Sequence, residues 1–409
     1  MTSAAPASTD TEDWKSRALE SEAERAELVA TVQRLTKAHV MGLVDLPPGV
    51  FPLWQQAHQS LLHTQGRTHA GIVIPKYPHI TDALFGVRGV TLLTAPYGIG
   101  KTTFTLDIAR SVAEAGNCQV VYITAEMTAV RLAQRLLVDM AAPQRGEGHP
   151  ITMQQLLTGD QMRTPAQREA HTNAEELHLG ELQAEMYRGA LEKFKALTGT
   201  KRLQIVDMKD IGSMHWSRGD GEHALTPLER HVDSITDRGS ETLILLDTIA
   251  HLEVQPNGAG GEVGDYKDDL SQDRDITAGL RQWREALGEK RALIAVHEES
   301  KARTGSGEGH AIRGSSRYAY GADALIQIVE AESNRGSVAL KLRDPTNDEG
   351  VSQIDVIINK ARDGGHSGTL IGLDHYYQSA EVREIERWTR RDIVAAKAAD
   401  SKSEKKSAK

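Results

Sequence analysis

Residues 95–102 read Ala-Pro-Tyr-Gly-Ile-Gly-Lys-Thr, and this stretch decides the fold. It matches the phosphate-loop (P-loop) pattern, in which a Gly-rich turn ends in Lys and Thr, except that Ala95 replaces the usual first Gly. The apolar residues 89–94 predict a strand before the turn, and the amphipathic residues 103–115 predict a helix after it. A Gly-rich turn without a nucleotide is disfavoured because strand, turn, Lys-Thr pair and helix all agree.

This turn has the chemistry that binds the phosphates of a nucleoside triphosphate. Gly98 and Gly100 let the backbone curl so that N–H groups point at the phosphates, and the helix N-terminus adds its positive dipole end. Lys101 neutralises phosphate charge, and the hydroxyl of Thr102 is a ligand for Mg²⁺. The predicted nucleotide-binding residues are Ala95, Gly98, Ile99, Gly100, Lys101, Thr102 and Thr103.

The composition of the 409 residues is that of an ordinary globular protein, with 39% hydrophobic and 26% charged residues. The formal net charge of −9 argues against a wholly basic nucleic-acid-binding surface but allows a local basic lining. The single cysteine, Cys118, excludes an intramolecular disulfide and fits a reducing compartment. Because the sequence has no long apolar run and no signal-peptide pattern, we expect a cytoplasmic protein with no membrane partner.

Apolar strands alternate with helices along the middle of the chain. Strands are predicted over residues 119–123, 203–208, 242–246 and 292–297, and helices over residues 130–140, 181–197 and 226–237. This order predicts an α/β fold with a mainly parallel sheet, whose functional residues lie at the carboxyl ends of the strands. Thr226 and Glu229 predict a capping box at the start of their helix.

Two acidic residues follow neighbouring strands of this predicted sheet. Asp247 ends the most strand-like run, which predicts a Walker B carboxylate that holds Mg²⁺ together with Thr102. A helix-capping Asp is the alternative, and the apolar run before it disfavours that reading. Glu126 follows the strand over residues 119–123, where a general base can polarise the attacking water; a surface carboxylate is its alternative.

Segments on either side of this core predict appendages. Residues 12–44 predict a thinly apolar helix that acts as a packing arm, with a short coiled coil or a solvated helix as alternatives. The chain then divides into a helical arm and linker (1–77), an ATPase domain (78–378) with a helical insertion at about 142–200, and a C-terminal helix with a disordered basic tail (379–409).

The end of the ATPase domain predicts an antiparallel edge. Strands near residues 337–343, 354–359 and 369–373 are joined as hairpins, and residues 381–397 predict a charged amphipathic helix. Lys360 and Arg362 share one face after the second of these strands, with no evident local carboxylate partner.

In combination these motifs resemble the RecA-like motor domain of DnaB-type hexameric replicative helicases and of the smaller RepA-like plasmid helicases. Residues 93–102 are similar to the first motif of that family, residues 125–127 (Ala-Glu-Met) to the second, and residues 245–248 (Leu-Leu-Asp-Thr) to its Walker B segment. Residues 360–365 (Lys-Ala-Arg-Asp-Gly-Gly) resemble the hairpin that the family presents to the nucleotide of a neighbouring subunit.

The resemblance implies a role for each catalytic candidate. Lys101 and Glu126 would act in their own subunit, and Lys360 and Arg362 on the neighbour's nucleotide; two solvated side chains on an exposed hairpin are the alternative for that pair. His297 would sense the γ-phosphate, although a merely satisfied polar residue is an equal reading. It stands where most of these helicases carry Ser-Gln, while RepA-like members use His.

The resemblance also implies an ATP- and Mg²⁺-dependent DNA helicase of phage or plasmid type. Its expected partners are single-stranded DNA, further copies of itself in a hexameric ring, and a loader, primase or polymerase. Two Gly-rich loops, residues 253–272 and 300–313, fall where the family binds DNA, and the candidate phosphate contacts are Lys267, Arg274, Lys301 and Arg303. A RecA/RadA-like recombination ATPase and a KaiC-like regulatory ATPase remain as alternatives.

Overall fold

The computed structural model describes a set of ranges that ends at residue 388. These are Ala30 and residues 67–141, 181–211, 214–216, 221–237, 239–252, 254–256, 269–299, 318–319, 321–330, 351–362, 364–376 and 381–388. The chain divides into two compact units, residues 1–68 and residues 69–409, and the architecture below is that of the second. The predicted arm apart from Ala30, the predicted strand 337–343 and the basic tail lie outside the described residues.

The second unit is built on a nine-stranded sheet with the order β11-β10-β9-β8-β1-β7-β5-β2-β3. The strands of its parallel part are β1 (Gly89–Pro96), β2 (Gln119–Thr124), β3 (Leu203–Asp207), β5 (Thr242–Asp247), β7 (Arg291–Glu299) and β8 (Ala324–Glu330). The antiparallel part consists of β9 (Val351–Ala361), β10 (Thr369–Tyr376) and β11 (Glu381–Trp388). The predicted parallel sheet with antiparallel C-terminal strands is therefore confirmed.

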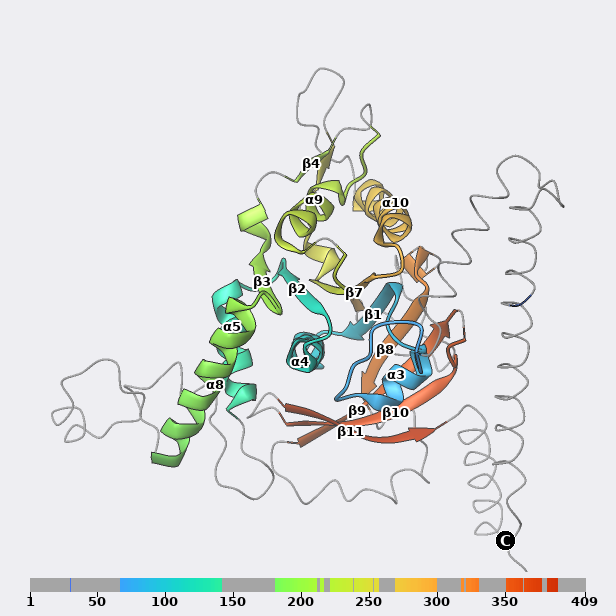
Figure 1. The fold of residues 1–409 in the computed structure, drawn as a ribbon. Coiled ribbons are helices and arrows are strands. Elements are labelled where there is room, and N and C mark those ends of the chain that lie inside the picture. The colour runs from blue at the N-terminus through green and yellow to red at the C-terminus, as the bar shows by residue number, and fades with distance from the viewer. Residues whose placement is uncertain are drawn as a thin grey trace, which may run out of the picture. The chain divides into compact units, whose positions relative to one another are not determined.

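Helices cover both faces of the parallel part (Figure 1). One face carries α4 (Lys101–Ala115), α5 (Ala129–Met140) and α8 (Glu181–Gly199), and the other carries α9 (Thr226–Ile235) and α10 (Asp269–Leu287). Figure 1 also shows the antiparallel strands curving beneath α4, and β11 packs against that helix. None of the described helices has both the length and the apolar character that crossing a lipid bilayer requires.

Alternation along the strands builds one core on each face of the sheet. In β5, Leu243 and Leu245 face the core that includes Phe104 of α4. Ile244 and its alternate neighbour Leu246 face the core that includes Trp283 of α10. A strand that is apolar at every position is typical of a sheet that is covered on both sides.

Short elements complete the unit. These are α3 (Pro78–Leu84), the 3-10 turns η1 (Met208–Ile211) and η3 (Ile249–His251), and a small parallel pair formed by β4 (His215–Trp216) and β6 (Gln255–Pro256). The compact unit begins before the predicted boundary at residue 78, because Ile72, Ile74 and Tyr77 are buried in the core beside α4. The predicted linker is thus partly a core segment.

The predicted helix over residues 381–397 is wrong for residues 381–388, which form β11. Val382 pairs with His375 of β10 and is fully buried. The Glu384 carboxylate accepts the backbone N–H groups of His79 and Ile80, both at 3.0 Å, at the start of α3. Pairing with β10 and this cap are tertiary contacts that override the local helical pattern.

The predicted capping box of α9 is also wrong, although the helix itself is present. Its N-cap is Leu225, and no side chain caps the helix. The hydroxyl of Thr226 instead accepts the backbone N–H of His223 at 2.9 Å, and Glu229 pairs with the ring of His223 at 3.3 Å. Both polar side chains therefore contact His223 in the preceding turn and do not cap the first N–H groups of the helix.

Candidate nucleotide-binding site

The P-loop connects the carboxyl end of β1 to the first residue of α4. Gly98 and Gly100 have φ values of 80° and 100°, a left-handed conformation that Gly adopts without strain. A Cβ at Gly100 would also clash with the imidazole of His375. The turn therefore requires Gly at position 100 for two reasons, its backbone angle and the close approach of β10.

Lys101 is folded back onto the loop that precedes it. Its ammonium donates to the carbonyl oxygens of Ala95 at 3.3 Å and Pro96 at 3.0 Å, and only 8% of the residue is exposed. Ala95 therefore takes part in the site through its carbonyl group, which needs no particular side chain. This contact fits the replacement of the usual Gly by Ala.

A cavity of about 400 Å³ opens above the P-loop, a size that suits a nucleotide. Its lining residues are Tyr97, Gly98, Gly100, Lys101, Thr102, Thr103, Glu126, Met127, Arg135, Glu298 and His375. The predicted contacts at positions 98 and 100–103 are therefore brought together. Ile99 is instead buried in the core beside α4, so its part in the site is to anchor the loop.

Asp247 lies at the carboxyl end of β5, beside β2. Its Oδ2 accepts the hydroxyl of Tyr122 at 2.7 Å, and Tyr122 in turn contacts the hydroxyl of Thr105 at 2.9 Å. Burial raises the pKa of Asp247, and Tyr122, Thr102 and Lys101 partly offset that effect. Sequence reasoning missed Tyr122, because an apolar strand contains no signal that one of its aromatic residues carries a functional hydroxyl.

The surroundings of Asp247 fit a divalent cation. Its Oδ1 is buried and makes no hydrogen bond with the described residues, although the Thr102 hydroxyl is close enough to act on the carboxyl's pKa. A hard cation such as Mg²⁺ prefers oxygen ligands of these kinds, a carboxylate and a hydroxyl. A bound cation would also offset the cost of keeping this carboxylate charged while buried.

Glu126 is exposed to the cavity, and the turn after β2 holds it there. The hydroxyl of Thr124 accepts the N–H of Met127 at 3.1 Å and donates to its carbonyl at 2.7 Å, which closes the turn around Glu126. The N–H of Ala125 donates to the carbonyl of Asp247 at 2.7 Å. These bonds fix the predicted base relative to the predicted Mg²⁺ ligand.

Besides Tyr97 and Met127, three residues of the cavity lining had no predicted role in it. Burial lowers the pKa of Arg135 of α5, and the negative charges of Asp247 and Glu126 partly offset that effect. Glu298 follows His297 on β7, and His375 comes from β10. Arg135 belongs to the helix predicted over residues 130–140, whereas nothing local marks His375.

The comparisons with known proteins identify the family of the chain and its fold. Residues 73–304 match the family model described as AAA domain. The chain belongs to this AAA-domain family. Among solved structures, it is similar to one described as an ATPase domain (16% identity, TM-score 0.56), covering 83% of this chain and 100% of that one.

The AAA-family chain is also similar to a DnaB-like replicative helicase whose structure was described with its interactions with primase. The identity is 15% and the TM-score 0.55, over 93% of this chain and 80% of that one. No curated protein matches the sequence significantly. Both structural likenesses support the RecA-like fold, a mainly parallel sheet with antiparallel edge strands.

His297 lies beside the cavity of this AAA-family protein rather than in its lining. It pairs with Thr94 at the end of β7, next to β1, and its ring centroid lies 5.2 Å from that of Tyr318. Tyr318 donates in turn to Asp273 of α10 at 2.8 Å. Burial lowers the pKa of His297, so its ring is neutral at pH 7. A role in sensing the γ-phosphate stays a prediction.

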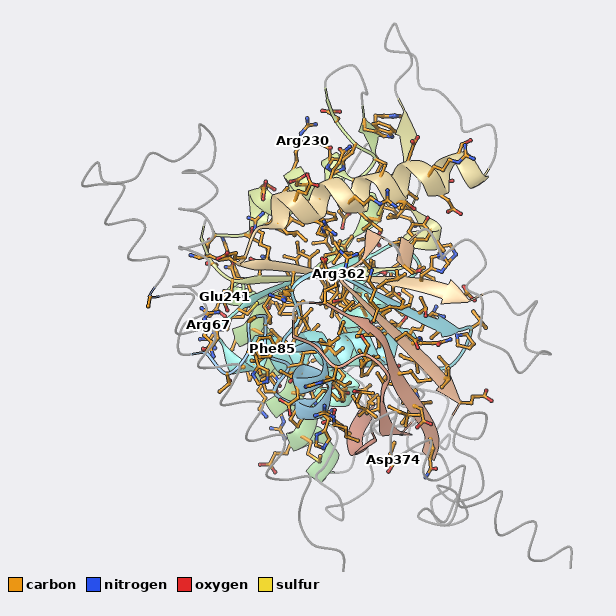
Figure 2. All side chains as sticks on the ribbon, turned by 90° about the vertical axis from the view of Figure 1, so that its right-hand side faces the viewer. Arg67, Phe85, Arg230, Glu241, Arg362 and Asp374 are labelled. Atoms are coloured by element: carbon orange, nitrogen blue, oxygen red, sulfur yellow. The ribbon has the colours of Figure 1, made fainter. Side chains whose placement is uncertain are left out.

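Lys360 and Arg362 lie toward the amino ends of the parallel strands, whereas the P-loop lies at their carboxyl ends. Ala361 pairs with Ala324 at the start of β8. Through β8, Lys360 is level with Leu92, and Arg362 is bonded to Asp323, which is bonded to Val90. Leu92 and Val90 precede Pro96 by four and six residues, which at about 3.3 Å per residue is roughly 13 Å and roughly 20 Å along β1. Figure 2 shows Arg362 and Asp374, which belong to the two ends of the β9–β10 hairpin, far apart.

The expectation that this basic pair has no local carboxylate partner is wrong. An Nη of Arg362 lies 3.4 Å from Oδ1 of Asp323. At its other end the antiparallel part reaches the P-loop, because β10 carries His375 to Gly100. Neither contact follows from residue spacing, since both partners are distant in sequence.

One DNA-binding candidate is described. Arg274 is exposed on α10, next to Asp273. Lys267, Lys301 and Arg303 lie outside the described residues. The assignment of these residues to DNA therefore stays a prediction.

Proposed function

We propose that this protein is an ATP- and Mg²⁺-dependent replicative DNA helicase that moves along single-stranded DNA as a hexameric ring. The observation that carries the proposal is the distance between the P-loop and the basic pair. Along β1, Lys360 and Arg362 lie roughly 13 Å and roughly 20 Å before the P-loop of their own subunit, toward the amino ends of the parallel strands. A pair so placed reaches a nucleotide only when a second subunit supplies it.

Residues in and beside the cavity would each contribute one part of hydrolysis. The loop N–H groups and Lys101 bind the phosphates, after the ammonium leaves the carbonyls of Ala95 and Pro96. Thr102 and Asp247 would hold Mg²⁺, which neutralises charge on the phosphate oxygens when it is bound. Glu126 would accept a proton from the attacking water. His297 and its contact with Tyr318 would transmit the state of the phosphates toward α10.

The step toward DNA is supported by the similarity to the DnaB-like replicative helicase, which the chain matches over most of its length. A ring places copies of one surface around a central channel, and a basic lining in that channel suffices to bind a single strand. Lys267, Arg274, Lys301 and Arg303 are the proposed contacts with phosphates of DNA.

Electron microscopy tests this proposal directly. The purified protein would be imaged with a non-hydrolysable ATP analogue and a single-stranded oligonucleotide. We expect closed or open rings with DNA in the channel. Helical filaments on the DNA would instead indicate a recombination ATPase, and rings that ignore DNA would indicate a regulatory ATPase.

A further inference from the structure

Asp323 lies at the centre of the contacts that hold the basic pair. Its side chain is largely buried, with 17% exposed. Oδ2 accepts the backbone N–H of Val90 at 3.1 Å, and Oδ1 lies 3.4 Å from an Nη of Arg284 and 3.4 Å from an Nη of Arg362. One carboxylate thus connects the start of β1, the end of α10 and the residue that follows β9.

Backbone bonds make the same connection. The N–H of Asp323 donates to the carbonyl of Val90 at 2.7 Å, and the N–H of Arg362 donates to the carbonyl of Asp323 at 3.1 Å. The ammonium of Lys360 donates to the carbonyls of Ala319 at 2.8 Å and Ala322 at 2.5 Å. Both basic residues are therefore attached to the segment just before β8, which is attached to the strand that carries the P-loop.

We propose that Asp323 is the positioning residue that orients Arg362 toward the nucleotide of the neighbouring subunit. This inference rests on the proposed function, because it requires Arg362 to act across the interface. A guanidinium has several N–H donors in a rigid plane, and Asp323 contacts one Nη group. Since 44% of the Arg362 side chain is exposed, other donors can reach phosphate oxygens while the carboxylate fixes the plane.

The charges around Asp323 give a physical reason for a carboxylate at this position. The negative charge of Asp323 favours the charged forms of Arg88 and Lys360, whereas the positive charges of Arg284 and Arg362 disfavour the charged form of Lys360. Without the carboxylate these like charges would repel one another. Arg362 is more exposed than Arg284, so it is the one that would turn away into solvent and lose its orientation.

Asp323→Asn tests the inference, because the amide still accepts the N–H of Val90 but carries no charge. We expect kcat for ATP hydrolysis to fall about ten- to hundredfold, as for a misplaced catalytic group. KM for ATP and ring assembly should stay unchanged, and Tm should fall by only a few degrees, as for the loss of one partly buried ion-pair partner. The matched control is Asp237→Asn, since Asp237 is a 61% exposed carboxylate that lies 3.6 Å from Lys201; it should behave as wild type.

Mixed rings supply a measurement that a merely structural role would not affect. Asp323→Asn mixed with Lys101→Ala should regain ATPase activity, because some interfaces combine an intact P-loop with an intact Asp323–Arg362 pair. Asp323→Asn mixed with Arg362→Ala should regain none, since both variants damage the same half of the shared site. Recovery in this second mixture would overturn the inference.

The outcomes separate this inference from the proposed function. If Arg362→Ala alone hydrolyses ATP normally within intact rings, the shared site itself is wrong and the role of Asp323 falls with it. If Arg362→Ala is inactive while Asp323→Asn has normal kcat, only the role of Asp323 is wrong. Should Asp323→Asn fail to fold, Asp323→Ser keeps an acceptor for Val90 and carries the same expectations.

Discussion

The two ends of the parallel strands, the carboxyl end with the P-loop and the amino end with Arg362, differ in what they can do within one subunit. At the carboxyl ends of the strands, the P-loop and Glu126 line one cavity. Asp247 is buried beside that cavity, where it accepts hydrogen bonds from the Tyr122 hydroxyl and from the N–H of Ala125. At the opposite end, Arg362 is nearly half exposed, and Asp323 holds it away from any nucleotide of its own subunit. The first end is a nucleotide-binding site. The second end presents a guanidinium that can bind phosphate oxygens but cannot reach the nucleotide of its own subunit.

This difference indicates how catalysis would depend on assembly. In the proposed ring, each subunit would hold the binding half of one ATP site and would supply the charge-stabilising half of its neighbour's site. A monomer would bind nucleotide and hydrolyse it poorly, because arginine supplied across an interface acts on the transition state. The following predictions test that division, in order of expected effect.

Loss of the basic pair should have the largest effect. Arg362→Ala should lower kcat about 10³-fold or more, the range for an arginine supplied by a neighbour, with ATP binding retained. Steady-state ATPase assays on intact rings measure this. Arg230→Ala is the control, because Arg230 is an exposed arginine paired with Glu222, far from Arg362 in Figure 2. Equal losses in both variants would contradict the comparison of the two ends.

Glu126→Gln should lower turnover about 10²-fold or more, because only proton abstraction is removed. ATP binding and ring assembly should be retained, as measured by nucleotide titration and size-exclusion chromatography. Glu298→Gln is a matched control, since Glu298 also lines the cavity. A larger loss in Glu298→Gln than in Glu126→Gln would transfer the role of base to Glu298.

His375 lies on β10 beside Gly100 of the P-loop, and it should make stability depend on pH. Burial lowers its pKa to about 4, below the ordinary value near 6.5, so the folded protein keeps the ring neutral. Its contribution is fully present above about pH 6.5 and is lost as the pH falls toward 4, by on the order of 3 kcal/mol. The free energy of unfolding, measured with urea, should fall less between pH 7 and pH 5 for His375→Asn than for wild type.

Tyr122→Phe should have the smallest effect, and it should change only the Mg²⁺ requirement of ATP hydrolysis. Removing the hydroxyl that donates to Asp247 should raise the Mg²⁺ concentration needed for half-maximal activity about tenfold, the size of a hydrogen bond to a charged group. kcat at saturating Mg²⁺ should stay near wild type. Tyr77→Phe, which removes a buried phenol bonded to Asp107, should leave the Mg²⁺ requirement unchanged.

Much of the carboxyl end could be predicted from contiguous residues. The P-loop signal lies within eight positions, Asp247 directly follows one predicted apolar strand, and Glu126 lies three residues after the end of another. Arg135 and Glu298 lie within or next to segments that were singled out, but spacing alone does not tell which side chains of a segment face a cavity. Tyr122, His375 and Asp323 could not be found in this way, because their partners are far away in sequence.

The sequence by itself determined the order of strands and helices, the P-loop and the two acidic residues, because turn chemistry and hydrophobic periodicity are local properties. Only the tertiary structure decided that residues 381–388 are a strand, that β10 returns His375 to Gly100, and that Asp323 holds Arg362. Strand pairing and buried ion pairs depend on which distant segments meet. That choice is made by packing the whole sheet, and no short stretch of the chain encodes it.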